Sequence, residues 1–220
     1  MKGLNALFIA NPLAFMGQYP MDISGDSALG RECNDPLAVP AGVYDFDLRA
    51  GSAGEVLLEL LSERTNPIQM FNVIRAPAGH KTTSKTNAIT AHWLPWDPKG
   101  TAQLTLPQAG PRFFFTSALA GCRFAVGPTA TPTVYHISGQ INQKARQKET
   151  DNVLGTGGLQ RTFSSTQHYG KSGSAFVAGY WDNATMTWCF VGQKVKPPAG
   201  FGQNYTVGTL KNMNNGVMMI

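Results

Sequence analysis

Glycine and proline recur so often along this chain that only short structural elements fit between them. The 220 residues include 24 glycines and 14 prolines, spread without a repeat. Both residues weaken or end helices and strands, so the elements between them are short. Apolar residues make up 42% of the chain, enough for a folded core, while charged residues make up only 14%, against roughly 25% in an average domain. We therefore predict a turn-rich domain dominated by β-structure.

Apolar and polar residues alternate in several of these segments, as they do in half-buried strands. The pattern is clearest over Val43–Arg49, where Tyr44, Phe46 and Leu48 share one face. The other predicted strands cover residues 68–76, 88–96, 102–106, 113–119, 122–126, 133–137, 175–181 and 184–191. The segment 113–119 is mostly apolar and is expected to be buried on both sides, either as a strand or as a strand that passes into a helical turn. Helices are predicted over 55–64, from leucines at helical spacing, and over 141–151.

No linker or internal repeat separates these segments, so we predict one domain over residues 1–220. It has an irregular stretch at 1–40 and a core over about 41–195. No apolar run reaches the ~18 residues that a membrane span needs. The net charge is +5, and no run of lysine or arginine forms a nucleic-acid patch. We expect a monomer that binds neither nucleic acid nor membrane.

The cysteines and histidines do not follow a metal-binding pattern. The chain has three cysteines, Cys33, Cys122 and Cys189, without a Cys-x-x-Cys spacing. An odd number argues against a disulfide framework and leaves at least one thiol unpaired. The four histidines are scattered with no metal-ligand spacing. We expect no metal and no other cofactor.

One cysteine and one histidine nevertheless stand where chemistry is possible. Cys122 follows Gly121 at the start of a predicted strand, and His136 lies fourteen residues later in the next. Neighbouring strands of one sheet could bring the thiol and the imidazole within reach, and such a pair is the minimum that thiol-based acyl transfer requires. Thr116 could orient the imidazole as a third group. The alternatives are a buried inert thiol, a core histidine and a threonine that simply suits a strand.

The tetrapeptide Trp93–Trp96 holds half of the four tryptophans. We favour a strand end that caps the core, with an aromatic wall beside a cleft as the alternative.

A series of short motifs in this order resembles a known family. The motifs are Trp93–Trp96, Phe114–Thr116, Leu119–Cys122, Val126–Gly127 and Val134–Ile137. Together they resemble the glutamine deamidase toxins that include Burkholderia lethal factor and the catalytic domain of the cytotoxic necrotizing factors. The match is dense over about residues 93–137 and hardly visible before residue 80.

The resemblance implies an α+β fold, with a sandwich of two mixed β-sheets flanked by a few short helices and long loops. It implies a nucleophile at Cys122, a base at His136 and a supporting polar group at Thr116. Ala120 departs from the family pattern, which has serine there. The implied substrate is a host protein, either a Rho-type GTPase or an RNA helicase of translation initiation. The toxin would be made in a bacterial cytoplasm and act in the host cytosol.

Two other classes of function remain open at this point. One is another thiol hydrolase, such as a cysteine peptidase. The other is a β-rich binding or structural module in which Cys122 is buried and inert.

Overall fold

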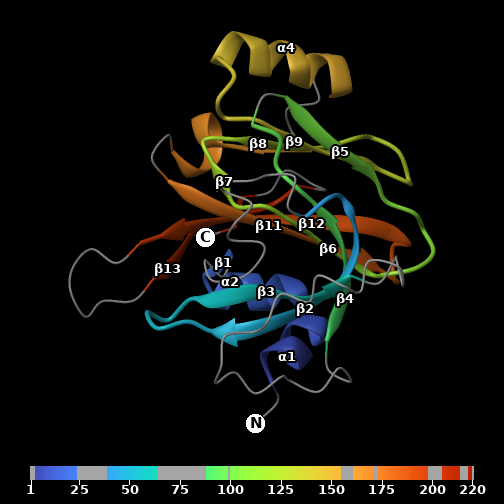
Figure 1. Ribbon diagram of the computed structural model, residues 1–220, viewed down its shortest axis with the longest axis vertical. Helices are drawn as coiled ribbons and strands as arrows, with labels where there is room; N and C mark the ends of the chain where they lie inside the picture. Colours follow the sequence, from blue (N-terminus) through green and yellow to red (C-terminus); the bar gives the residue numbers. More distant parts are fainter. Residues whose placement is uncertain are drawn as a thin grey trace.

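Figure 1 shows the computed structural model of the chain. It describes residues 3–23, 39–63, 88–98, 100–154, 161–170, 173–197, 205–213 and 218–219. The strand predicted over 68–76 lies outside these ranges, as does Cys33.

Most strands belong to one large mixed sheet. In spatial order they are β1 (Met21–Ile23), β3 (Val56–Glu63), β2 (Gly42–Ala50), β4 (Ile89–Leu94), β6 (Phe113–Thr116), β11 (Ser174–Asp182), β12 (Thr187–Lys196), β13 (Thr206–Asn212) and β14 (Met218–Met219), with β7 (Leu119–Ala120) also paired to β11. The β1–β3 and β4–β6 pairs are parallel, and the other pairs are antiparallel.

A second, smaller sheet lies above the large one in Figure 1. Its order is β10 (Thr162–Ser164), β8 (Arg123–Val126), β9 (Thr133–Ile137) and β5 (Thr101–Thr105), and every pair is antiparallel. Helix α4 (Gln143–Leu154) covers the side of this sheet that faces away from the large sheet (Figure 1). The helix predicted over 141–151 is therefore confirmed.

The central strands of the large sheet are buried on both faces, because an apolar core lies on each side of them. Phe115 packs against Phe8 and Phe46 in one core. Its neighbour Phe114 points the other way and contacts Phe124 of the small sheet. Successive side chains in a strand face opposite sides, so this apolar run supplies both cores at once. The predicted two-sided burial of this segment is confirmed.

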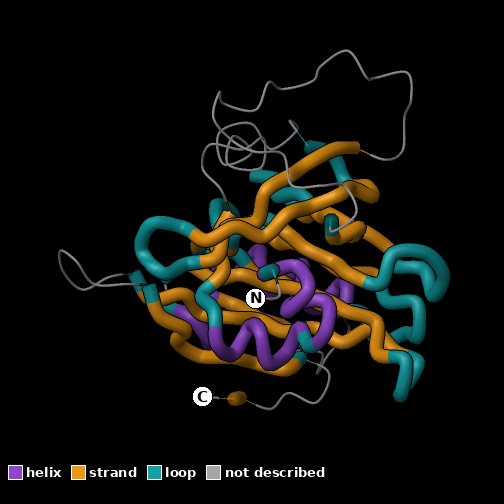
Figure 2. The backbone as a smooth tube through the Cα atoms, turned by 90° about the horizontal axis from the view of Figure 1, so that it is seen from below, coloured by secondary structure: helices purple, strands orange, loops and turns teal. Residues whose placement is uncertain are grey.

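Residues 1–40 are not irregular throughout, which corrects that prediction. Helices α1 (Leu4–Ala10) and α2 (Pro12–Gln18) lie beneath the large sheet (Figure 2). Asn11 accepts a hydrogen bond from the Ala14 N–H and caps α2, which begins with Pro12. Seven-residue helices are unstable in isolation, so they depend on packing, here through the fully buried Phe8.

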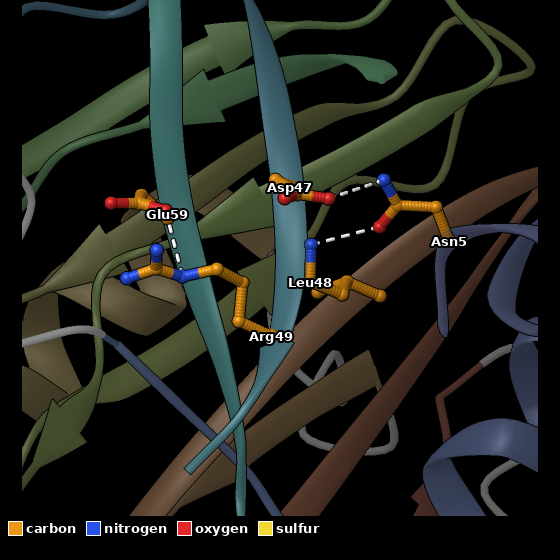
Figure 3. Close-up of polar contacts among 5 residues, drawn as sticks. All are labelled: Asn5, Asp47, Leu48, Arg49 and Glu59. Atoms are coloured by element: carbon orange, nitrogen blue, oxygen red, sulfur yellow. Dashed lines mark hydrogen bonds and ion pairs between the residues drawn. The ribbon is translucent and has the colours of Figure 1, made fainter. Parts of the chain in front are cut away.

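A buried amide fastens α1 to the sheet (Figure 3). The Asn5 side chain donates to the Asp47 carboxylate at 2.6 Å and accepts from the Leu48 N–H at 2.8 Å. Leaving such a buried group unpaired would cost about 1–3 kcal/mol. The nearby ion pair between Arg49 and Glu59, 2.9 Å apart, is more exposed and contributes no more than about 1 kcal/mol.

The helix predicted over 55–64 is wrong, because this segment forms β3. It pairs with β2 on one side and with β1 on the other. The leucines that suggested helical spacing lie in this strand: Leu57 pairs with both neighbouring strands and Leu60 with β2, and Leu58 is fully buried. Tertiary pairing has overridden a local helix preference of a few tenths of a kcal/mol per residue.

The β-rich architecture with two sheets and short helices agrees with the predicted fold class. The small sheet, however, is antiparallel instead of mixed. The core also extends beyond the predicted range of 41–195, because Phe8 and Leu210 are both buried in it. None of the helices among the described residues has the length and hydropathy needed to cross a membrane.

Candidate active site

Thr116 and His136 meet between the two sheets. Thr116 ends β6 of the large sheet and His136 lies in β9 of the small one; both are fully buried. Thr116 Oγ1 lies 3.0 Å from His136 Nδ1 and donates its own hydrogen bond to the Leu94 carbonyl at 2.8 Å. The predicted contact between threonine and imidazole is therefore present.

These two hydrogen bonds determine where the imidazole carries its proton. Thr116 has a single hydroxyl proton, and the Leu94 carbonyl can only accept it. At the imidazole, Oγ1 must therefore accept, so Nδ1 carries the proton. In the neutral ring, Nε2 then presents a lone pair. This nitrogen is buried and has no hydrogen-bond partner within the described structure, which leaves it able to take a proton.

Burial keeps the imidazole neutral. Removal from water lowers the pKa of His136 to about 3, because the interior does not solvate an imidazolium. At neutral pH His136 is consequently a base with an available lone pair, and a preformed thiolate–imidazolium ion pair is disfavoured.

Cys122 lies on the same side of the small sheet as His136. Phe124 is directly opposite His136 in the β8–β9 pair, and Cys122, one residue before β8 and two before Phe124, is buried in the same apolar core as Phe124. Cys122 thus points toward the face that carries the imidazole, one diagonal step away. Gly121 precedes it with a φ of +82°, a conformation that explains the glycine at this position.

The sulfur has polar neighbours of its own. The Gly139 N–H donates to Cys122 Sγ at 3.2 Å, and Sγ lies 3.9 Å from the Ala120 carbonyl. No hydrogen bond joins Sγ to His136 Nε2, since Nε2 has no partner among the described residues. Catalytic hydrogen bonds are often long in enzymes without substrate and shorten when substrate binds.

A small pocket opens over the sulfur. Its volume is about 220 Å³, and its described lining residues are Trp96, Ser117, Ala118, Ala120, Cys122, Gly139 and Gln140. None of these carries a charge. Pockets for whole drug-sized molecules measure about 300–1,000 Å³, so this one suits a group the size of an amino-acid side chain.

Comparison with known protein families and with curated proteins finds no match to this chain.

The pocket contains residues that sequence reasoning missed. Gly139 and Gln140 follow a strand end, and nothing in the local pattern connects them with Cys122. Trp96 forms part of the wall, as in the alternative that we did not favour, whereas Trp93 is fully buried in the core as favoured. In the sequence, the signal that Trp96 lines a pocket was its position directly after Pro95, at the end of the predicted strand.

Among the described residues, Cys189, His92 and His168 are not part of the lining of this pocket. Cys189 lies in β12, where burial is the main cause that raises the pKa of its thiol. The Ser164 N–H donates to His168 Nδ1 at 3.0 Å, and His168 Nε2 lies 3.0 Å from Lys211 Nζ. Among the described residues, no group of histidine, cysteine and carboxylate side chains could hold a metal ion.

Replacing Thr116 with valine is expected to lower the rate of thiol-dependent catalysis by about 10²-fold. Valine keeps the shape but removes the acceptor that holds the imidazole, and a positioned base contributes about 10²–10⁴-fold. The rate of the glutamine deamidation that the resemblance implies measures the effect. Thr116→Ser, which keeps the hydroxyl, is the matched control and should retain most activity. Full activity in Thr116→Val would refute the positioning role.

Stability is expected to fall as pH drops below about 6.5. The folded-state pKa of His136 is about 3 and the unfolded value 6.5, so the unfolded chain binds an extra proton between these values. The free energy of unfolding should decrease by about 2 kcal/mol from pH 7 to pH 5 through this residue. His168, whose pKa is lowered to about 4 by burial, acts in the same direction.

Urea unfolding at pH 7 and pH 5 measures this dependence. In His136→Gln, which carries a neutral side chain at both pH values, the decrease should shrink by about 2 kcal/mol. If the free energy of unfolding fell by the same amount between pH 7 and pH 5 in His136→Gln, then His136 would not be the residue that causes the pH dependence.

Proposed function

We propose that this protein is a cysteine-dependent glutamine deamidase that converts a glutamine of a substrate protein to glutamate. The observation that carries the proposal is the hydrogen-bond order from Leu94 through Thr116 to His136, which leaves Nε2 as a base on the face that carries Cys122. Cys122 is then the nucleophile, His136 the base and Thr116 the group that orients the base.

The neutral imidazole favours a mechanism in which proton transfer accompanies attack. His136 Nε2 takes the proton from Cys122 Sγ as the sulfur attacks the carboxamide carbon of glutamine. The oxygen of the tetrahedral intermediate becomes negative and is stabilised by nearby N–H donors. The imidazolium of His136 gives this proton to the amide nitrogen of the substrate. The carbon–nitrogen bond then breaks, ammonia departs, and a thioester between Cys122 and the substrate remains. Water, deprotonated by His136, then attacks the thioester to release glutamate and the thiol.

The pocket supports a neutral side chain as substrate. A charged side chain would lose its hydration there without finding an opposite charge among the described lining residues. The volume of about 220 Å³ suits one side chain better than several residues of a bound peptide. This favours the amide of a glutamine over a peptide bond and makes deamidation the better proposal than peptide cleavage.

The resemblance to the deamidase toxins adds the rest of the proposal. By that resemblance, the fold is a sandwich of the family type, and the substrate is a host protein such as a Rho-type GTPase or an RNA helicase of translation initiation. The site of action would be the host cytosol.

The test is to incubate a eukaryotic cell lysate with this protein and map glutamine-to-glutamate conversions by mass spectrometry, with Cys122→Ser as the blank. A conversion that occurs only with the unmodified protein supports the proposal and names the substrate. Peptide bonds cut in place of conversions would indicate a cysteine peptidase. Neither product, together with a Cys122 thiol inert to iodoacetamide, would overturn the proposal in favour of a binding module.

A further inference from the structure

The turn that follows β9 is held rigidly although it lies outside any helix or strand. Ser138 is fully buried, and its hydroxyl donates to the Pro98 carbonyl at 2.8 Å. The same oxygen accepts from the Gln140 N–H at 3.0 Å, and the Ser138 N–H donates to the Gly100 carbonyl at 3.1 Å. These three hydrogen bonds hold Ser138 and the peptide unit between Gly139 and Gln140, and so fix the backbone next to the Gly139 N–H.

This turn packs against the backbone that carries the thiol. A side chain at Gly139 would place its Cβ 2.7 Å from the Gly121 carbonyl carbon and 3.0 Å from the Cys122 nitrogen. Because real Cβ atoms do not approach backbone so closely, only glycine allows the two segments to touch. With the two segments in contact, the Gly139 N–H donates a hydrogen bond to Cys122 Sγ, 3.2 Å away.

A π-helical turn, η3 (Ser165–Tyr169), also makes hydrogen bonds to the backbone that carries the thiol. The Tyr169 hydroxyl donates to the Cys122 carbonyl at 2.6 Å, and the Ser165 hydroxyl donates to the Gly121 carbonyl at 3.1 Å. Sγ and the Gly139 N–H thus face each other from two fixed backbones. A fixed donor beside a sulfur stabilises negative charge without having to reorganise when the charge appears.

We infer that the Gly139 N–H is a catalytic group that stabilises the Cys122 thiolate, and that Ser138 is the positioning residue that aims it. The inference rests on the proposed function. As the proton moves from Sγ to His136 Nε2, the charge left on sulfur is met by this N–H. A hydrogen bond to a charged partner is about twice as strong as one between neutral groups, so it favours the thiolate over the thiol.

The test is the pH profile of Cys122 alkylation by iodoacetamide in the Ser138→Ala variant, followed by mass spectrometry of the Cys122 peptide. Loss of the aimed donor should move the midpoint of the profile up by about one pH unit and slow alkylation at pH 7 by about tenfold. Thr129→Ala is the matched control. It removes a hydroxyl-to-carbonyl hydrogen bond, from Thr129 to Thr131, in the loop at the opposite end of β8 and β9, and should leave the profile unchanged.

Alkylation of Cys189 in the same samples reports on the integrity of the fold. An unchanged Cys122 profile in a folded Ser138→Ala variant would overturn the inference. If that variant does not fold, an NMR measurement on the unmodified protein tests the inference instead. The Gly139 amide proton should shift with pH in step with the alkylation profile, and the shift should vanish in Cys122→Ser. An amide that does not follow the thiol would overturn the inference.

The alkylation profile does not depend on deamidation, since it needs no protein substrate. A profile that shifts as expected, in a protein that cuts peptide bonds in the lysate in place of converting glutamine, would support the N–H donor and overturn only the proposed deamidation.

Discussion

Replacement of Cys122 with serine is expected to lower glutamine deamidation by at least about 10³-fold while leaving the fold intact. Loss of a catalytic nucleophile costs up to about 10⁶-fold in well-studied hydrolases. A serine hydroxyl is far less acidic than a thiol, and His136 is a weak base because burial lowers its pKa to about 3. The deamidation rate on the substrate found in lysate, measured as ammonia release, gives the loss.

The fold should tolerate this change. A serine oxygen can accept the Gly139 N–H in place of sulfur, and the two side chains are close in volume. The free energy of unfolding should therefore change by less than about 1 kcal/mol. Cys189→Ser in β12, outside the residues that line the pocket, is the matched control and should keep full activity. Retained activity in Cys122→Ser would rule out the thiol as nucleophile.

Replacement of Gln193 with alanine should cause the largest loss of stability, about 3–5 kcal/mol in the free energy of unfolding. Gln193 is fully buried in β12 and joins this strand to the stretch of chain that runs from α2 into β1. Its amide nitrogen donates to the carbonyls of Met16 and Tyr19, and its oxygen accepts from the Met21 N–H at 2.7 Å. Truncation leaves three backbone groups unpaired, at about 1–3 kcal/mol for each that stays buried.

Urea unfolding followed by tryptophan fluorescence measures this loss. The matched control is Gln103→Ala on the exposed side of β5, which should change stability by no more than about 0.5 kcal/mol. A loss below about 1 kcal/mol in Gln193→Ala would mean that water replaces the amide, and that the N-terminal segment does not depend on this residue.

Much of the strand layout could be read from the sequence. The alternation through Tyr44, Phe46 and Leu48 predicted β2, and the two-sided apolar run at Phe114 and Phe115 predicted a strand between two cores. Both patterns are local, because the side-chain period of a strand requires no knowledge of its neighbours. The helices α1 and α2 could not be read in this way, since each is too short for a helical period to emerge.

The candidate residues of the site also came from the sequence, but their arrangement did not. Cys122 and His136 were nominated by chemical type and by the short connection between β8 and β9. The link from Thr116 to His136 crosses from one sheet to the other, and no spacing along the chain encodes how two sheets pack.

By itself, the sequence determined a β-rich chain with an imidazole on one strand and a thiol next to the start of the neighbouring strand. The tertiary structure decided which imidazole nitrogen carries the proton, that a neutral pocket covers the sulfur, and that the Gly139 N–H faces Sγ. The physical reason for this division is the distance along the chain over which each interaction acts. Strand periodicity and turn chemistry act between residues a few positions apart, whereas hydrogen bonds between sheets and desolvation of a buried ring depend on segments that meet only in the folded chain.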